Sequence, residues 1–563
     1  PFPYAWRYRN YVIDAFNADK PYDQFLLEQI AGDLIDSENP DEQARHLVAT
    51  GFLALGSMDL NERDREQFLL DRIDDQIDTL GRATMGLTLG CARCHDHKFD
   101  PVAQTDYYAL AGIFASTKTL SGQSNRSGNS KQYHQPKLLA SLDTDFAESV
   151  RAAAEREARI GSLEARLAEL KKIGKEGNPG PARRKELKRE FFSVQKELNE
   201  LRKGEAEPAN LPANSKKKGG APAIDPNAPL AMAAVDGAVT DLALRVRGEP
   251  DLKGDIVPRA FPLVLRHPST PELASEGSGR LELAEWLVSS DHPLTARVMA
   301  NRVWQHLFGR GIVETVDNFG ISGSAPTHPA LLDHLATKFV EEGWSVKSLV
   351  REIVLSRAYR LASSHDEDNA AADASNRLYW RANFRRLEAE AIRDSLLAAG
   401  GMLQAERPEG APVDPDRRAP AKAKGKKRVV NRDPIASPVR SVYLPVMRSK
   451  LPGMFTVFDF AEPDQVNGQR DVTTVAPQAL FLLNNPFVVE VSTKAAERIL
   501  EQELPDEASR LRYAYAYALC RYPTESETSR ALAFLSEGGE DRGAAWSALT
   551  QALYSSAEFR YVP

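Results

Sequence analysis

Cys91-Ala92-Arg93-Cys94-His95 is the stretch of this chain that carries the strongest structural signal. Its C-x-x-C-H spacing is the one that covalent attachment of haem requires, because two thiols add to the two vinyl groups of the ring and the adjacent imidazole ligates the iron. The chain has only 3 cysteines in 563 residues, so composition alone seldom produces this arrangement. The motif predicts a covalently bound haem c on Cys91 and Cys94, with His95 as an axial ligand of the metal.

Three other interpretations of the two cysteines stay open. A C-x-x-C pair can be a redox dithiol, but that motif usually opens a helix after a strand, and no such pattern surrounds it here. It can be half of a zinc site, which needs a second ligand pair, whereas Cys520 is far away in the sequence and His97 would serve only with distortion. It can also be an inert disulfide, since C-x-x-C closes a small loop in oxidising compartments.

The second axial ligand of such a haem is not evident from the sequence. No methionine lies between His95 and Met232, so the usual downstream methionine is missing. Candidates are Met58, Met85, His134 and the histidines of the second half, and an open or water-ligated iron is the alternative. The distinction matters because a six-coordinate haem transfers electrons, whereas an open one binds or activates small oxidants.

Composition sets the broad class of the protein. Hydrophobic residues at 42% and charged residues at 27% are globular values, and the length predicts two or three domains. A net charge of −7 gives no reason to expect nucleic acid, and no apolar run is long enough to predict a membrane span. Because the chain starts at Pro1 and not at Met, we expect a preceding segment. Haem is attached to C-x-x-C-H outside the cytoplasm, so the motif predicts an exported protein, periplasmic or extracellular.

The predicted fold class is mainly α and multidomain. We expect a helical domain over 1–143 that holds the motif, with a helix over 61–85 and two glycines, Gly86 and Gly90, that let a flat ring approach or simply end the helix. Residues 144–203 have two apolar seams around a turn at 177–180, which predicts an inserted antiparallel coiled-coil hairpin that packs on itself or offers a partner surface.

Two further regions follow. Residues 204–270 read as a linker and a small β element, with Asp236-Gly237 as a hairpin turn. Residues 271–563 predict a helical domain with a disordered loop over 404–437, in which Thr327 and Ser345 are expected helix caps and 442–446 an extended segment.

Polar side chains at helical spacing are the other candidate site. Arg297, Asn301 and Gln305 share one face of a predicted helix, as do Arg302 and His306. The residues that follow nearby are Asp317, Asn318, His328, Asp333 and His334, and a second polar group comprises Arg385, Arg386, Glu388, Glu390, Arg393 and Asp394. Such clusters can bind a metal or a sugar, but arginine-rich networks more often hold helices together, and we expect the latter.

Four strings give the chain a family resemblance. The segment from GLTLGC (86–91) to Phe114 resembles the cytochrome-like domain of large planctomycete secreted proteins. The strings LTARVMANRVWQHLFGRG (294–311), RRLEAEAIRD (385–394) and QALFLLNNPF (478–487) resemble the planctomycete-specific second domain that follows it. The resemblance implies an exported two-domain protein, often preceded by an additional cytochrome domain and associated with secreted polysaccharide machinery.

Three functional hypotheses result. The first is an exported c-type haem protein that exchanges electrons with a redox partner or with an additional cytochrome domain, tied to polysaccharide degradation or uptake. The second is a peroxidase-like haem enzyme, which needs an open sixth position and a distal acid or base. The third is a non-haem binding or scaffold protein among polysaccharide-processing proteins, with the cysteines as a disulfide or a metal site.

Overall fold

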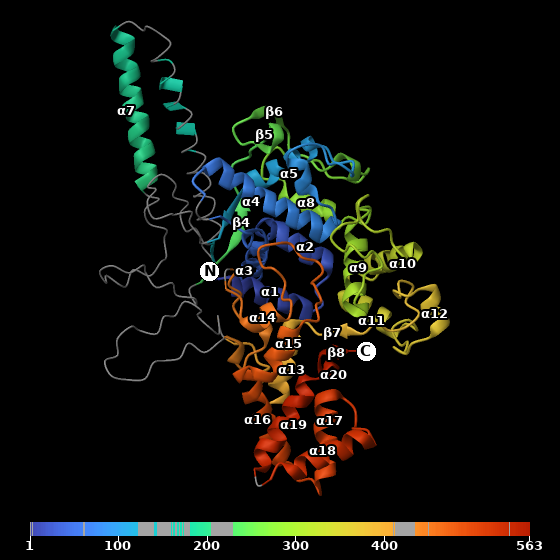
Figure 1. Cartoon of the computed structure of the whole chain (residues 1–563). Coiled ribbons are helices and arrows are strands. Elements are labelled where there is room, and N and C mark those ends of the chain that lie inside the picture. Colours follow the sequence, from blue (N-terminus) through green and yellow to red (C-terminus); the bar gives the residue numbers. More distant parts are fainter. Residues whose placement is uncertain are drawn as a thin grey trace, which may run out of the picture.

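The chain is mainly helical, as predicted (Figure 1). This computed structural model describes residue 2, residues 4–59, 62–121 and 140–142, parts of 159–173, and residues 181–203, 229–408, 410, 434–448, 450–539 and 541–562. Residues 204–228 of the predicted linker and β element and most of the loop predicted over 404–437 lie outside the described residues, and so does His134.

Five helices and four short turns build the first part of the chain. They are α1 (Ala5–Asn17), α2 (Tyr22–Ala31), η1 (Gly32–Leu34), α3 (Pro40–Ala49), η2 (Thr50–Ala54), α4 (Arg65–Leu80), the π-turn η3 (Gly81–Met85), η4 (Leu89–Arg93) and α5 (Gln104–Ala115). Helix α4 begins where the Asp64 carboxylate accepts the first free N–H groups. Its apolar positions, with Ile73 and Ile77 at the centre, are buried against α5.

Three small antiparallel strand pairs lie beside these helices. They are β1 (Thr117–Leu120) with β4 (Ala233–Asp236), β2 (Ala140–Ser141) with β3 (Leu230–Ala231), and β5 (Leu242–Arg245) with β6 (Lys253–Val257). The predicted hairpin turn at Asp236-Gly237 is therefore wrong, because the strands on its two sides belong to different pairs. Instead, the Asp236 carboxylate accepts bonds from Ser278 and Arg280, and the Gly237 N–H donates to the Ser116 carbonyl.

A helical hairpin projects from the body of the molecule and contains α7 (Pro181–Lys203) (Figure 1). Leu163 and Leu167 of the preceding segment pack with Leu198 of α7. The ion pair between Arg166 and Glu190 (Nη2–Oε1, 2.6 Å) crosses between the two segments. The two seams thus pack against each other over the described residues, and the predicted turn at 177–180 lies outside them.

The remaining elements make up the second half of the chain. They are η6 (Val246–Gly248), η7 (Leu263–Leu265), α8 (Arg280–Val288), α9 (Thr295–Phe308), α10 (Pro329–Glu341), α11 (Val346–Leu355), α12 (Glu367–Ala372), β7 (Arg385–Arg386), α13 (Ala389–Ala399), η8 (Pro434–Ala436), η9 (Ser441–Tyr443), α14 (Gly453–Val457), α15 (Ala476–Asn484), α16 (Pro486–Leu500), α17 (Glu507–Leu519), α18 (Glu525–Glu537), α19 (Arg542–Ser555), α20 (Ala557–Arg560) and β8 (Tyr561–Val562). Ser345 caps α11, as predicted, through a bond from the Ser348 N–H. Residue His328, and not Thr327, precedes α10, and the segment predicted as extended begins with the turn η9.

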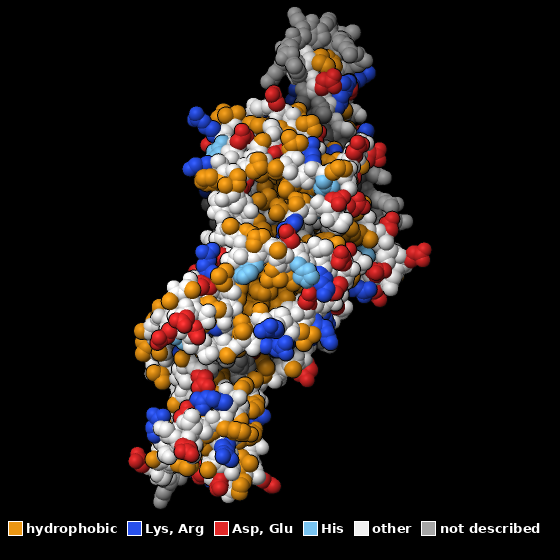
Figure 2. Space-filling model, turned by 90° about the vertical axis from the view of Figure 1, so that its right-hand side faces the viewer, with side chains coloured by type: hydrophobic (Ala, Val, Ile, Leu, Met, Phe, Trp, Pro, Cys, Tyr) orange, Lys and Arg blue, Asp and Glu red, His pale blue; other side chains and the backbone are white. Residues whose placement is uncertain are grey.

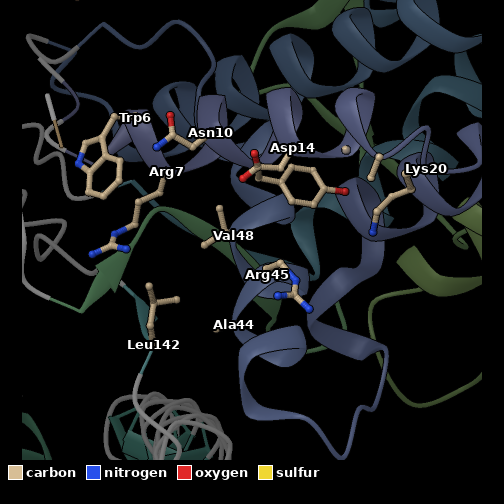
Figure 3. Close-up of a pocket in the computed structure, with 12 residues that line it drawn as sticks. Trp6, Arg7, Asn10, Asp14, Lys20, Ala44, Arg45, Val48 and Leu142 are labelled. Carbon is tan, nitrogen blue, oxygen red and sulfur yellow. The ribbon is translucent and has the colours of Figure 1, made fainter. Parts of the chain in front are cut away.

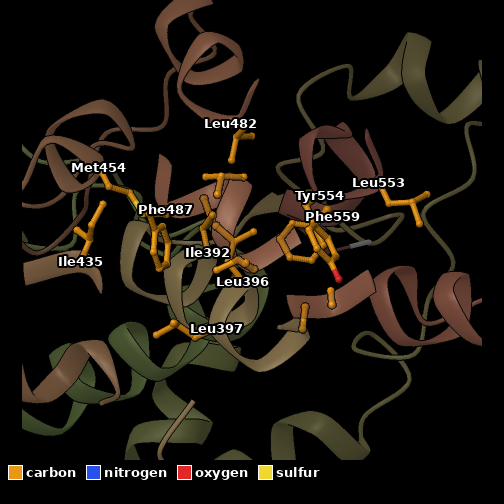
Figure 4. Close-up of a cluster of buried hydrophobic side chains, with 14 of the residues drawn as sticks. Ile392, Leu396, Leu397, Ile435, Met454, Leu482, Phe487, Leu553, Tyr554 and Phe559 are labelled. Carbon is orange, nitrogen blue, oxygen red and sulfur yellow. The ribbon is translucent and has the colours of Figure 1, made fainter. Parts of the chain in front are cut away.

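Separate hydrophobic cores support the two ends of the molecule. Around Phe487, Trp546 and Phe559, helices α13, α16 and α19 enclose one of them (Figure 4). Another is shared between the two halves of the chain, since Trp286 of α8 packs with Ile73 and Phe114 in the same cluster. The face turned away from the hairpin carries patches of hydrophobic side chains among charged ones (Figure 2).

One buried arginine ties α8 to the first part of the chain. The Arg280 side chain is completely buried. Its Nη1 and Nη2 each lie 2.8 Å from an oxygen of Asp33, and Nη2 lies 2.7 Å from Asp236. A further bond of 2.9 Å runs to the Ile30 carbonyl. Helix α8 is therefore fixed to α2 and β4 by a network of charge-assisted hydrogen bonds.

Candidate functional site

The C-x-x-C-H motif begins on the 3₁₀ turn η4, which ends at Arg93, and Cys94 and His95 follow this turn before the start of α5. Both cysteines are exposed and free. Both thiols are therefore accessible from the solvent.

The imidazole of His95 is exposed, and one of its nitrogens is engaged. Its Nδ1 lies 2.7 Å from the Asp96 carbonyl oxygen. Because a carbonyl oxygen can only accept, Nδ1 must carry the hydrogen of the neutral ring. Nε2 then keeps its lone pair, which is the state in which a histidine binds a metal while the other ring nitrogen orients it.

The backbone of the turn is held from α5 and from α4. The Arg93 carbonyl accepts bonds from the Tyr108 hydroxyl (3.1 Å) and from Gln104 Nε2 (2.9 Å). The Arg93 guanidinium forms ion pairs with Asp71 (2.9 Å) and Asp74 (3.4 Å) of α4. The turn is thus fixed through its central residue, while the reactive side chains on either side stay uncovered.

The two cysteines have different neighbours. Cys91 lines a hollow of about 470 Å³ together with the acidic face of α4, on which burial raises the pKa of Asp74 and of Asp75. Cys94 lies against Gly248, whose φ is +77°. A Cβ atom at that glycine would be 2.6 Å from the Cys94 sulfur, so a larger residue there would displace the thiol.

His97 differs from His95 although only one residue separates them. Its side chain is 5% exposed. Nδ1 accepts the N–H of Asp100 at 2.8 Å, and Nε2 lies 3.3 Å from the Thr88 hydroxyl. With both nitrogens engaged in local bonds, His97 has no lone pair for a zinc ion or for the second face of a haem.

A loop of the second half holds the segment that contains the motif. The N–H of Phe319 donates to the Gly86 carbonyl (2.7 Å), and the N–H of Ile321 donates to the Asp100 carboxylate (2.6 Å). Gly86 has a φ of +60°, and the Phe319 ring lies so close that a Cβ would be 2.7 Å from it. This glycine therefore ends a helix and receives an aromatic side chain of the same protein.

The polar groups predicted in the second half form internal contacts. The two nearest the motif are Arg302, which binds Asp317 (2.8 Å) and the Arg82 carbonyl (2.9 Å), and Asn301, which is fully buried and exchanges two bonds with Val313. The other pairs are Arg297–Asp333, His334–Glu352, Arg386–Asp459 and Arg470–Glu390, and Arg393 is buried among backbone carbonyls. In the described part of the chain, no three His, Cys, Asp or Glu side chains are arranged so that they could hold a metal ion.

The residues around the motif fit a covalently attached haem on one of its faces. Two free thiols, a histidine with an available Nε2 and exposed apolar side chains at Phe99 and Leu252 are present. Met85, a candidate for the ligand on the opposite face of the haem, is 1% exposed and lies within the hydrophobic core, so it is not available there. Reasoning from sequence missed Gly248 and the loop around Phe319, because nothing local in the sequence shows what they contact.

Comparisons with known proteins place two domains on the chain. Residues 1–119, which include the motif, match the family PSCyt2, described as a protein of unknown function (DUF1549). Residues 279–535 match the family PSD1, described as a protein of unknown function (DUF1553). No curated protein and no solved structure matches the chain. Among the described helices, none is both long enough and apolar enough to cross a bilayer. The chain thus carries the planctomycete-type domain pair of unknown function, DUF1549 followed by DUF1553.

Proposed function

We propose that the protein is an exported c-type haem protein that transfers electrons, with the haem attached through Cys91 and Cys94 and with His95 as an axial ligand. One observation carries the proposal. The bond from His95 Nδ1 to the Asp96 carbonyl leaves Nε2 exposed and free, directly after two exposed thiols. A redox dithiol or a disulfide has no need of a histidine in this state.

Each part of the turn has a task in this proposal. Cys91 and Cys94 would hold the haem through two thioether bonds, and His95 would ligate its iron. The Asp96 carbonyl holds the His95 ring in one orientation, as outer partners of metal-binding histidines do. Gln104 and Tyr108 keep the Arg93 carbonyl in place, so the spacing of the two thiols is constant. When bound, the haem supplies a one-electron redox couple.

The surroundings of the motif support exchange of electrons with another protein. Phe99, Leu252 and Ile256 are more than half exposed, and they belong to the segment after the motif and to the β5–β6 hairpin beside Cys94. Exposed apolar groups next to a redox centre are suited to a transient contact of modest area. The partner in this proposal is a redox protein or an additional cytochrome domain, tied to secreted polysaccharide-processing proteins in the periplasm or outside the cell.

The decisive experiment is a pyridine haemochrome spectrum of the full chain, exported in a host with c-type maturation machinery. We expect a covalent c-type spectrum from the wild type and none from Cys91→Ala/Cys94→Ala. Cys520→Ala is the matched control, since it removes the third cysteine, which is also exposed and caps α17 far along the chain. A colourless wild-type protein under these conditions overturns the proposal.

The placement of the thiols also favours a second candidate function. Cys91 and Cys94 are both free and exposed and are separated by two residues, the spacing at which a disulfide closes a small loop, and a haem-free binding or scaffold protein would use them so. A thiol titration of the reduced, denatured protein separates the two. A protein with a disulfide shows 3 reactive thiols after reduction, two from the disulfide and one from Cys520. A protein with covalent haem shows only the thiol of Cys520.

A further inference from the structure

A cavity of about 400 Å³ lies between α1 and α3 (Figure 3). This volume is within the range of about 300–1,000 Å³ that is usual for pockets that take small molecules. Neither α4 nor α5, the helices that hold the C-x-x-C-H turn, contributes to it. A ligand of this cavity is therefore independent of the proposed haem.

The walls of the cavity are mostly apolar. Tyr11 and Ala15 of α1 face Val48 of α3, and all three are buried in one hydrophobic cluster. Leu142, at the end of β2, contributes a further apolar side chain (Figure 3). The Tyr11 ring is held by a bond from its hydroxyl to Glu28 (2.8 Å) and by stacking on Phe25. It is therefore a rigid surface for the apolar body of a ligand.

The charged groups at the cavity differ in whether they are already paired. Asp14 is bound by Arg407, and Lys20 is bound by Glu28. Arg45 of α3 is exposed and has no ion pair within the part of the chain that the structure describes. Arg7 adds a second guanidinium, which lies 4.5 Å from the centre of the Trp6 ring. The charge left for a ligand at this cavity is thus the positive charge of Arg45.

We propose that this cavity binds a small amphipathic carboxylate, a molecule with one carboxylate group and an aliphatic or aromatic body. The carboxylate binds the Arg45 guanidinium, which presents two parallel N–H groups suited to its two oxygens. The body packs on the Tyr11 ring, Val48 and Leu142. Inorganic anions lack the apolar part, and cationic amphiphiles meet Arg45 with charge of the same sign.

The test is titration calorimetry of the full chain with octanoate and with 3-phenylpropanoate. Octylammonium has the same body as octanoate and the opposite charge, and inorganic phosphate has charge without a body. We expect both carboxylates to bind at least about tenfold more tightly than either control ligand, the ratio that one charged hydrogen-bonding contact gives. Equal binding of octylammonium and octanoate, or no binding of octanoate, overturns the proposal.

Two variants locate the binding in this cavity. Arg45→Gln removes the charge at an exposed position and should weaken octanoate about tenfold. Ala44→Leu fills part of the cavity from the half-buried neighbouring position and should abolish binding. Arg360→Gln, an exposed arginine of the second half, is the control and should bind as the wild type does. Wild-type affinity in Arg45→Gln overturns the assignment, provided that all three variants unfold at the wild-type temperature.

Discussion

The C-x-x-C-H turn and the second half of the chain differ in whether their polar side chains are already bound within the protein. At the turn, Cys91, Cys94 and one nitrogen of His95 are exposed and unengaged. In the second half, Asn301 and Arg393 are fully buried, and their polar atoms are taken up by the backbone of the same protein. His97 shows the second behaviour within the first region, two positions after His95. A histidine of the candidate site thus has a nitrogen that is free to bind a ligand, whereas a histidine that stabilises the fold has none.

The largest effect in this comparison is expected at Arg280. Arg280→Met should lower the free energy of unfolding by about 3–5 kcal/mol, because it leaves Asp33 buried without its cation. Burial already raises the pKa of Asp33, so its charge depends on this arginine. Urea denaturation at neutral pH measures the change. A loss below about 1 kcal/mol, the value of exposed pairs, would contradict the role given to Arg280.

The two neighbouring histidines give the sharpest test of the comparison. His97→Ala should cost about 2–3 kcal/mol, because it leaves the Asp100 N–H and the Thr88 hydroxyl without their partner. His95→Ala should change stability by less than about 0.5 kcal/mol, since its side chain is exposed. If the protein carries the proposed haem, the effect on the absorption spectrum should follow the opposite order. His95→Ala should then alter the bands that report the axial ligand, and His97→Ala should not. Equal destabilisation by both substitutions would remove the distinction.

His292 extends the comparison to pH. Burial lowers the pKa of His292 to about 3, and the nearby His267 adds to the effect. An unfolded histidine has a pKa near about 6.5, so below that pH the unfolded chain binds the extra proton and stability falls as the pH falls. Wild type should lose about 1.6 kcal/mol between pH 6.5 and pH 5 that His292→Asn does not lose. Asparagine keeps an acceptor for the N–H groups that begin α9. Parallel slopes for the two proteins in urea denaturation across this range would contradict the assignment.

The smallest effect is expected at the exposed end of the polar network. Arg297→Ala breaks a pair with Asp333 (2.7 Å), but both side chains are more than a third exposed. Solvent screens such pairs, so the loss should be below about 1 kcal/mol and should shrink further in high salt. Thermal unfolding at low and high salt measures it. A larger loss of stability that does not change with salt would mean that this pair contributes as the buried polar contacts do.

Local sequence patterns predict the helices well, but they do not predict contacts between segments that are far apart in the sequence. Ser345 caps α11, as predicted, because this is a property of a few adjacent residues. The pairing of β1 with β4 joins strands separated by more than a hundred residues, and Asp236-Gly237 was consequently misread as a hairpin turn. Arg280 shows the same limit, since nothing next to it in the sequence announces that Asp33 will meet it.

The candidate site likewise contains residues that the sequence can predict and residues that it cannot. The spacing of Cys91, Cys94 and His95 is a local feature, so the sequence alone is enough to single them out. The engagement of His97 also depends on nearby residues, but it requires the turn geometry to be known. Gly248 beside Cys94 and Phe319 beside Gly86 come from remote segments, and they become visible only in the folded chain.

The loop that contacts the motif segment is synthesised long after it. The N–H that binds the Asp100 carboxylate belongs to Ile321, 221 residues further along. At about 5–20 residues per second, this interval lasts on the order of 10–40 seconds. During that time a growing chain has its two thiols and His95 complete but has neither the Phe319 ring at Gly86 nor the bond to Asp100. Order of synthesis therefore leaves the segment with the motif without its contacts from the second half until the chain has grown past Ile321.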